Sequence, residues 1–131
     1  SGVSKVPLNY DHMLDVTFTD PQVARVGLTA QALADRGIEY VVADYPFDDH
    51  GKSILMEAKY GFVRIFGERP TGRILGAEIV SKDAGELIHA LSIAVSHGLT
   101  AASLMQTHWY HPTLSEILTY PLDDIVDELA K

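Results

Sequence analysis

The sequence has 131 residues, of which 47% are hydrophobic and 21% charged, a composition typical of one globular domain rather than a disordered chain. Eighteen acidic residues against ten Lys and Arg give a net charge of −8, which argues against binding to a nucleic-acid backbone. No apolar run approaches the ~20 residues needed to span a bilayer, and no secretion signal is recognisable. We therefore expect a cytoplasmic protein with neither nucleic-acid nor membrane partners.

The first third of the chain is expected to contain short strands and one helix. Alternating apolar residues predict strands at 16–18 and 23–28. Strong helix formers occupy residues 30–36, and Gly37 is the expected stop. The β-branched and aromatic run 38–45 then predicts a third strand.

The middle of the chain contains the best candidate for a β-hairpin. Residues 48–52 are polar and are predicted to form a loop. Two strands are then predicted at 59–66 and 73–80, joined by the segment 68–72, which is rich in residues that tolerate turn geometry.

The strongest helix signal covers residues 83–97. Asp83 and Glu86 have the spacing of a capping box, and Gly98 is the expected stop. The apolar residues of this helix form an arc wider than the single stripe of a surface helix: Ala84, Leu87, Ile88, Ala90, Leu91, Ile93, Ala94 and Val95. A chain of this size has little material to cover both sides, so we expect the helix to contribute to a subunit interface.

Three shorter helices are predicted after it, at 100–105, 113–119 and 122–129, with Tyr120-Pro121 separating the last two. Together these elements predict an α+β fold. We expect an antiparallel sheet of about four or five short strands with helices packed on it and a helical C-terminal part.

The segment His-Pro-Thr-Leu-Ser-Glu at 111–116 carries the most chemistry. Pro112 disfavours the helical region for the residue before it, so His111 should be extended at the mouth of a turn. Thr113 and Glu116 have the spacing of a capping box, which would bring imidazole and carboxylate together at a helix N-terminus. This layout suits an acid–base pair, although the same residues could simply cap a helix beside an ordinary loop histidine.

A metal hydrolase is an alternative, because His108, His111 and Glu116 offer three potential zinc ligands. Pro112 interrupts the helix that would align both imidazoles on one face, so we expect no metal site. The remaining histidines receive no functional role from their positions: His12, His50, His89 and His97.

Three segments, taken in order, resemble one known family. They are residues 18–29 (Phe-Thr-Asp-Pro-Gln-Val-Ala-Arg-Val-Gly-Leu-Thr), the glycine-containing segments 61–64 and 72–77 that precede 84–88, and the segment 111–116. The sequence resembles the C-terminal dimerisation domain of the pyridine nucleotide-disulfide oxidoreductases over about residues 15–120, and most resembles the dihydrolipoamide dehydrogenase branch. Three ordered motifs are more specific than any one of them.

The resemblance implies the fold of the FAD- and NAD-linked reductase dimerisation domain for residues 15–131, with residues 1–14 as a linker or a cloning junction. It implies a homodimer in which His111 takes a proton from a dithiol substrate at the partner subunit's active site. Glu116 would orient that imidazole and stabilise its charged form. His111 and Pro112 could contact the FAD of the partner subunit.

Enzymes of this family use a redox-active cysteine pair, FAD and NAD(P). This sequence has no cysteine and no Gly-x-Gly-x-x-Gly phosphate loop. We therefore expect FAD and NAD(P) to be bound by upstream domains of a longer polypeptide, and the isolated domain to be inactive and free of cofactor. The alternative is a stand-alone α+β dimeric assembly or binding module without catalysis.

Overall fold

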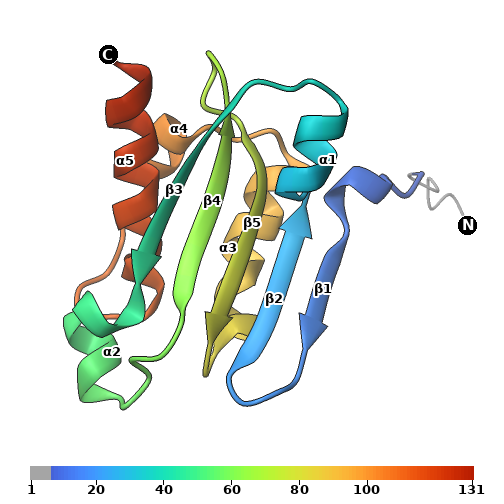
Figure 1. Cartoon of the computed structure of the whole chain (residues 1–131). Coiled ribbons are helices and arrows are strands. Elements are labelled where there is room, and N and C mark those ends of the chain that lie inside the picture. Colours follow the sequence, from blue (N-terminus) through green and yellow to red (C-terminus); the bar gives the residue numbers. More distant parts are fainter. Residues whose placement is uncertain (1–6) are drawn as a thin grey trace, which may run out of the picture.

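The computed structural model describes residues 7–131 and contains one antiparallel sheet with the strand order β1-β2-β5-β4-β3 (Figure 1). The predicted α+β architecture is therefore confirmed. The five strands are β1 (Leu14–Thr17), β2 (Gln22–Gly27), β3 (Tyr40–Pro46), β4 (Phe62–Glu68) and β5 (Ile74–Ser81).

Helices cover one face of the sheet, and this side holds the main core (Figure 1). The long helix α3 packs on β2 and β5, and α5 packs on β3 and contacts α4. The helices are α1 (Ala30–Asp35), α2 (Gly51–Leu55), α3 (Ala84–Ser96), α4 (Ala101–Met105) and α5 (Thr119–Leu129), with 3₁₀ turns η1 (Tyr10–His12), η2 (Phe47–Asp49) and η3 (Ser115–Leu118).

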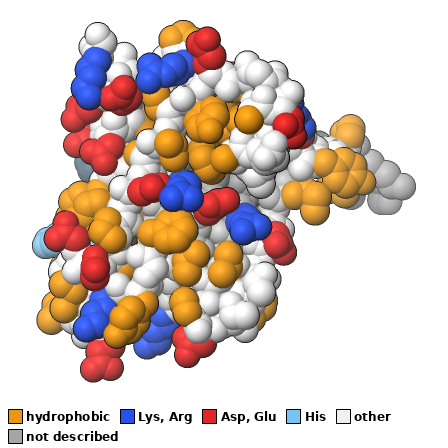
Figure 2. Space-filling model, viewed as in Figure 1, with side chains coloured by type: hydrophobic (Ala, Val, Ile, Leu, Met, Phe, Trp, Pro, Cys, Tyr) orange, Lys and Arg blue, Asp and Glu red, His pale blue; other side chains and the backbone are white. Residues whose placement is uncertain are grey.

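Within residues 7–131, the opposite face of the sheet is covered by a helix only at one end, where α1 joins β2 to β3. Leu33 of α1 is fully buried there and forms a second, smaller core with Phe66 and Leu75. The rest of this face carries charged residues that lie in register across all five strands, in the order Asp15, Arg25, Glu78, Arg64 and Asp44. Figure 2 shows this band of alternating acidic and basic side chains crossing the sheet.

Ion pairs within this band join neighbouring strands. Arg64 Nε lies 2.7 Å from Asp44 Oδ1, and Arg64 also approaches Glu78 at 3.7 Å. These side chains are between 22% and 49% exposed, so each pair contributes at most about 1 kcal/mol and weakens with salt. The band keeps this face of the sheet polar in the middle while the other face is apolar.

The long helix α3 buries one face only. Six of its apolar residues lie against the sheet: Ala84, Leu87, Ile88, Leu91, Ala94 and Val95. Ile93 points away and is 58% exposed, so the wide apolar arc continues onto the surface. The expected Asp83 cap is wrong, because the Asp83 side chain makes no capping hydrogen bond. The Gln22 side chain from β2 instead accepts a hydrogen bond from the Gly85 backbone at 3.0 Å.

Two other predicted boundaries also differ. The polar segment 48–52, expected as a loop, contains the end of η2 and the start of α2, because Phe47 and His50 are buried and draw this segment onto the core. The expected break at Tyr120-Pro121 is absent. Pro121 lies in the first turn of α5, where its missing N–H has no helical acceptor to lose.

The expected start of the domain at residue 15 falls inside regular structure. Strand β1 begins at Leu14, and η1 precedes it. The two terminal guanidinium nitrogens of Arg36, Nη1 and Nη2, each donate to the Asp11 carboxylate at 2.8 Å, and this hydrogen bonding lowers the pKa of Asp11. The residues just before β1 are thus attached to the end of α1.

Candidate active site

The loop between α4 and η3 presents His111, and both of its ends are anchored. Trp109 is half-buried against the core, and its Nε1 donates a hydrogen bond to the Leu104 carbonyl at 2.9 Å. On the other side, the Thr113 hydroxyl donates to the Tyr110 carbonyl at 2.7 Å. The loop therefore has defined supports on either side of the exposed histidine.

His111 and Glu116 form a hydrogen-bonded pair. His111 Nδ1 lies 2.8 Å from Glu116 Oε1 and 2.7 Å from Oε2. The imidazole is 81% exposed, whereas the carboxylate is 11% exposed. A carboxylate only accepts hydrogen bonds, so Nδ1 carries the proton in the neutral form of the ring, and Nε2 is then the nitrogen with the free lone pair.

Glu116 has a second imidazole partner. His50 Nε2 lies 3.2 Å from Glu116 Oε1, and His50 Nδ1 lies 2.7 Å from the Ser53 hydroxyl. His50 is 1% exposed and Ser53 is fully buried. The carboxylate therefore lies between an exposed histidine from its own loop and a buried histidine from the start of α2.

Two tyrosines, one partly buried and one exposed, pack beside His50. The Tyr120 ring packs edge-on against His50, with 6.1 Å between ring centroids, and Tyr45 stacks on Tyr120 at 4.3 Å. The Tyr45 hydroxyl donates to Asp49 Oδ2 at 3.0 Å. Burial, followed by this hydrogen bond, raises the pKa of Tyr45 to about 12.

One comparison with known proteins decides the family to which the chain belongs. The family model described as the pyridine nucleotide-disulphide oxidoreductase dimerisation domain matches residues 13–121. The chain belongs to this family. The resemblance seen in the three sequence motifs is thereby confirmed.

Two relatives of this dimerisation domain are dihydrolipoyl dehydrogenases. The mitochondrial enzyme of Pisum sativum is 34% identical over 111 residues, which are 85% of this chain and 22% of the relative. The enzyme of Halobacterium salinarum is 37% identical over 109 residues, which are 83% of this chain and 23% of the relative. The chain thus spans less than a quarter of the length of either relative.

Solved structures show the same fold. LpdA from Mycobacterium tuberculosis superposes with a TM-score of 0.85 at 28% identity, covering 91% of this chain and 26% of that chain. The HOCl-induced flavoprotein disulfide reductase RclA from Escherichia coli has a TM-score of 0.80 over 86% of this chain and 26% of that chain. Its identity is 24%, so it supports the fold alone.

The dimerisation domain only partly forms the capping box expected at Thr113 and Glu116. Thr113 Oγ1 accepts a hydrogen bond from the Glu116 backbone at 3.3 Å, which is one half of the motif. The Glu116 side chain bonds the two imidazoles, so the reciprocal half is replaced by the pair with His111. The residues that follow form the 3₁₀ turn η3 rather than the start of an α-helix.

The other candidate ligand does not join this site. His108 is exposed, and within residues 7–131 no three His, Cys, Asp or Glu side chains gather closely enough to hold a metal ion. His50, which was expected to have no functional role, is the residue of this network that sequence reasoning missed. Its spacing from Ser53 fits a helix N-cap and the third helical position, but no local pattern links it to Glu116.

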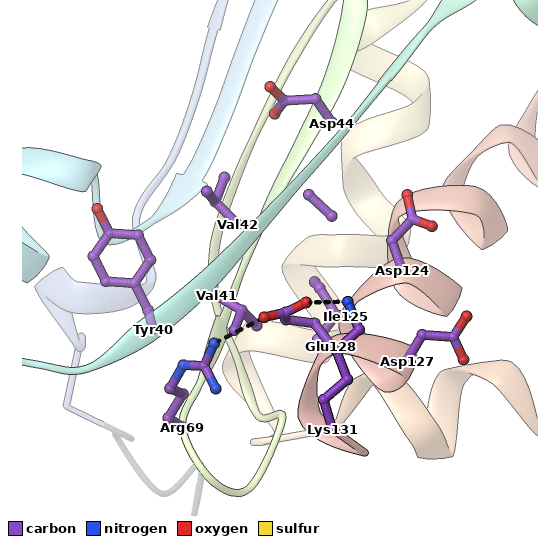
Figure 3. A pocket seen from close by; sticks show the side chains of 11 residues that line it. Tyr40, Val41, Val42, Asp44, Arg69, Asp124, Ile125, Asp127, Glu128 and Lys131 are labelled. Carbon is purple, nitrogen blue, oxygen red and sulfur yellow. Dashed lines mark hydrogen bonds and ion pairs between the residues drawn. The ribbon is translucent and has the colours of Figure 1, made fainter.

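A groove of about 680 Å³ lies away from this pair, between the edge strand β3 and α5 (Figure 3). Asp124, Asp127 and Glu128 line it, and Glu128 accepts hydrogen bonds from Arg69 and Lys131. Neither His111 nor Glu116 borders this groove.

In the part of the chain that the structure describes, none of the helices is long and apolar enough to cross a membrane.

Proposed function

We propose that this chain is the dimerisation domain of an FAD- and NAD(P)-dependent disulfide oxidoreductase of the dihydrolipoamide dehydrogenase type. In this proposal His111 is the acid–base residue that the domain supplies to the active site of the partner subunit. The observation that carries the proposal is the pair itself, an exposed imidazole held through Nδ1 by a nearly buried carboxylate.

The roles of the two side chains follow from their exposure. His111 Nε2 would accept the proton of a substrate thiol, which leaves a thiolate able to attack a disulfide. The positive charge formed on the imidazole would be stabilised by Glu116, whose interaction with it is strengthened by the low-dielectric surroundings of the carboxylate. The exposed ring could then release the proton to solvent.

The chain supplies the proton-transfer groups, and the remaining chemistry must come from elsewhere in the polypeptide. Bound FAD and NAD(P) would supply two-electron transfer, with the cofactors held by upstream domains. The sequence has no cysteine, so the redox-active pair would also lie upstream. His111 and the adjacent exposed Pro112 are the residues of this chain that could approach the partner's flavin.

The test is a His111→Gln variant in a polypeptide that includes the flavin domains. Rapid-mixing absorbance of the flavin should show reduction by dithiol slowed by about 10²- to 10⁴-fold, the usual contribution of a general base. Oxidation of NAD(P)H by an artificial acceptor that bypasses the dithiol should remain near the parent rate, because His111 has no part in hydride transfer. Normal dithiol kinetics in the variant would refute the proposed role.

A further inference from the structure

The buried imidazole of His50 is within hydrogen-bond distance of Glu116, the same carboxylate that pairs with His111. We propose that His50, itself fixed by Ser53, is a positioning residue that sets the Glu116 carboxylate for its pairing with His111. This inference rests on the function proposed above, and it adds a residue 66 positions away from Glu116 to the proposed proton-transfer machinery.

The hydrogen bonds define the direction of the network. Ser53 is fully buried, so its hydroxyl hydrogen must find its acceptor inside the protein, and His50 Nδ1 lies 2.7 Å away. When Nδ1 accepts this hydrogen bond, the proton of the neutral ring is on Nε2, the nitrogen that faces Glu116. Ser53 thereby selects the tautomer in which His50 donates to the carboxylate.

Hydrogen bonds from the two imidazoles offset the free-energy cost of burying the Glu116 carboxylate. The carboxylate is 11% exposed, and within residues 7–131 its ion-pair partners are His50 and His111, with no Lys or Arg among them. A nearly buried carboxylate without donors is costly. Loss of His50 would leave Glu116 with only the hydrogen bond from the exposed ring of His111, so the carboxylate would be free to rotate.

The position of His50 in the fold makes this contact rigid. His50 is the N-cap residue of α2, and Glu116 lies on η3. Tyr120 packs edge-on against the His50 ring, and Tyr45 stacks behind Tyr120. The nearby Asp49 carboxylate is engaged by the Tyr45 hydroxyl rather than by His50. The orientation of Glu116 is therefore set by tertiary packing and not by its own loop alone.

The first test uses the 131-residue chain and imidazole nitrogen NMR, which reports tautomers without any activity. In the parent chain His111 should give the signature of a ring protonated on Nδ1. His50→Gln retains a donor near the position of Nε2 and should retain this signature. His50→Phe removes the donor, and the His111 signals should shift toward a mixture of tautomers. An unchanged His111 signature in His50→Phe would overturn the inference.

The second test measures dithiol-to-flavin transfer in the polypeptide with its flavin domains. His50→Phe should lower kcat by about 10- to 100-fold, the scale expected when a catalytic group is misplaced. KM for the dithiol should change little because His50 is buried and touches no substrate. His50→Gln should recover most of the rate. Equal rates for His50→Phe and the parent protein would overturn the inference.

Controls separate positioning from stability and from the underlying function. Leu33→Val trims the second core on the other face of the sheet, so it should lower stability without changing the His111 signature or the dithiol rate. If His50→Phe does not fold, Ser53→Ala removes only the tautomer lock and should show a smaller loss of the same kind. If dithiol oxidation is slow in His111→Gln but near the parent rate in Ser53→Ala and His50→Phe, this inference alone is rejected. If dithiol oxidation is also near the parent rate in His111→Gln, the proposed function is rejected.

Discussion

His111 Nδ1 lies 2.7 Å from Glu116 Oε2, although the first side chain is 81% exposed and the second 11%. This difference in exposure gives the two residues different roles in the proposed pair. The interior fixes the carboxylate and strengthens its electrostatic effect, while the surface leaves Nε2 of the imidazole free. A base arranged in this way can act on a group carried by another surface, which is what the proposed function requires of His111.

The cap and the pair can now be tested separately, because they use different atoms. The cap joins the Thr113 hydroxyl to the backbone nitrogen of Glu116, whereas the pair uses the Glu116 side chain. Thr113→Ala should cost about 1 kcal/mol of unfolding free energy and leave dithiol oxidation near the parent rate. Urea unfolding of the chain and flavin-reduction kinetics of the extended polypeptide would measure both effects.

Glu116→Gln should give the opposite result. The amide has nearly the same shape and keeps an acceptor oxygen, and the backbone cap is untouched, so stability should change little. Loss of the negative charge should slow dithiol oxidation, but by less than the ~10²- to 10⁴-fold expected for removing the base itself. A Glu116→Gln protein that loses stability yet turns over normally would show that Glu116 is only structural.

The Tyr45 hydroxyl should titrate late in an alkaline titration. Burial and the hydrogen bond to Asp49 raise its pKa from 10.0 to about 12 in the folded chain. Its contribution to stability is therefore complete below about pH 10 and is lost as the pH rises through about 12. Phenolate absorbance should show one late component that Tyr45→Phe removes. Unfolding measured from pH 10 to 12 should then show a shallower loss of stability in the variant.

The sequence predicted the elements whose signals are local. The hairpin of β4 and β5 followed from two predicted strands joined by a turn-rich segment, and α3 followed from its apolar arc. The pairing of His111 with Glu116 was also predictable, because only four residues, one of them Pro112, lie between them. These features depend on neighbours along the chain, which a single sequence displays directly.

The features that were missed depend on burial by distant segments. Helix α2 begins in a segment whose sequence is polar. The segment folds onto the core because Phe47 and His50, which precede the helix, are buried. The bond from His50 to Glu116 joins residues 66 positions apart, and no periodicity reports such a contact. Pro121 was predicted to separate two helices, but a proline breaks a helix only in its interior. Helix α5 begins only two residues before Pro121, and the sequence does not show that start.

Two glycines should differ sharply in their tolerance of alanine. A Cβ at Gly76 would lie 2.1 Å from the Leu28 carbonyl oxygen and 2.9 Å from its nitrogen, so the backbone of β5 or of the segment after β2 would have to move. Gly37 has φ +64 but no atom within 4 Å of a Cβ. Gly37→Ala should therefore cost only about 1 to 2 kcal/mol. Thermal unfolding should show a much larger loss for Gly76→Ala, and equal losses would contradict the close approach.

The wide apolar arc of α3 predicts that this helix contributes to a homodimer interface. Leu91, whose side chain a sequence-based reading would place at the interface, is 1% exposed beneath the helix. Leu91→Asp should therefore unfold the chain, since it places a charge in the core. Ile93 is 58% exposed on the outer side of α3, so Ile93→Asp should keep the circular dichroism spectrum and stability of the parent chain.

If α3 lies near the two-fold axis of a homodimer, Ile93→Asp should convert dimer to monomer in sedimentation velocity, because a symmetric contact places both new charges in one interface. Ile54→Asp is the matched control, since Ile54 is 50% exposed on α2 and should leave the dimer intact. The comparison should be made in a polypeptide that also includes the proposed flavin domains as well as in the chain alone. A dimer that survives Ile93→Asp but dissociates with Ile54→Asp would show that the interface lies on α2 and not on α3. The interface would then include the surface beside the His50 network.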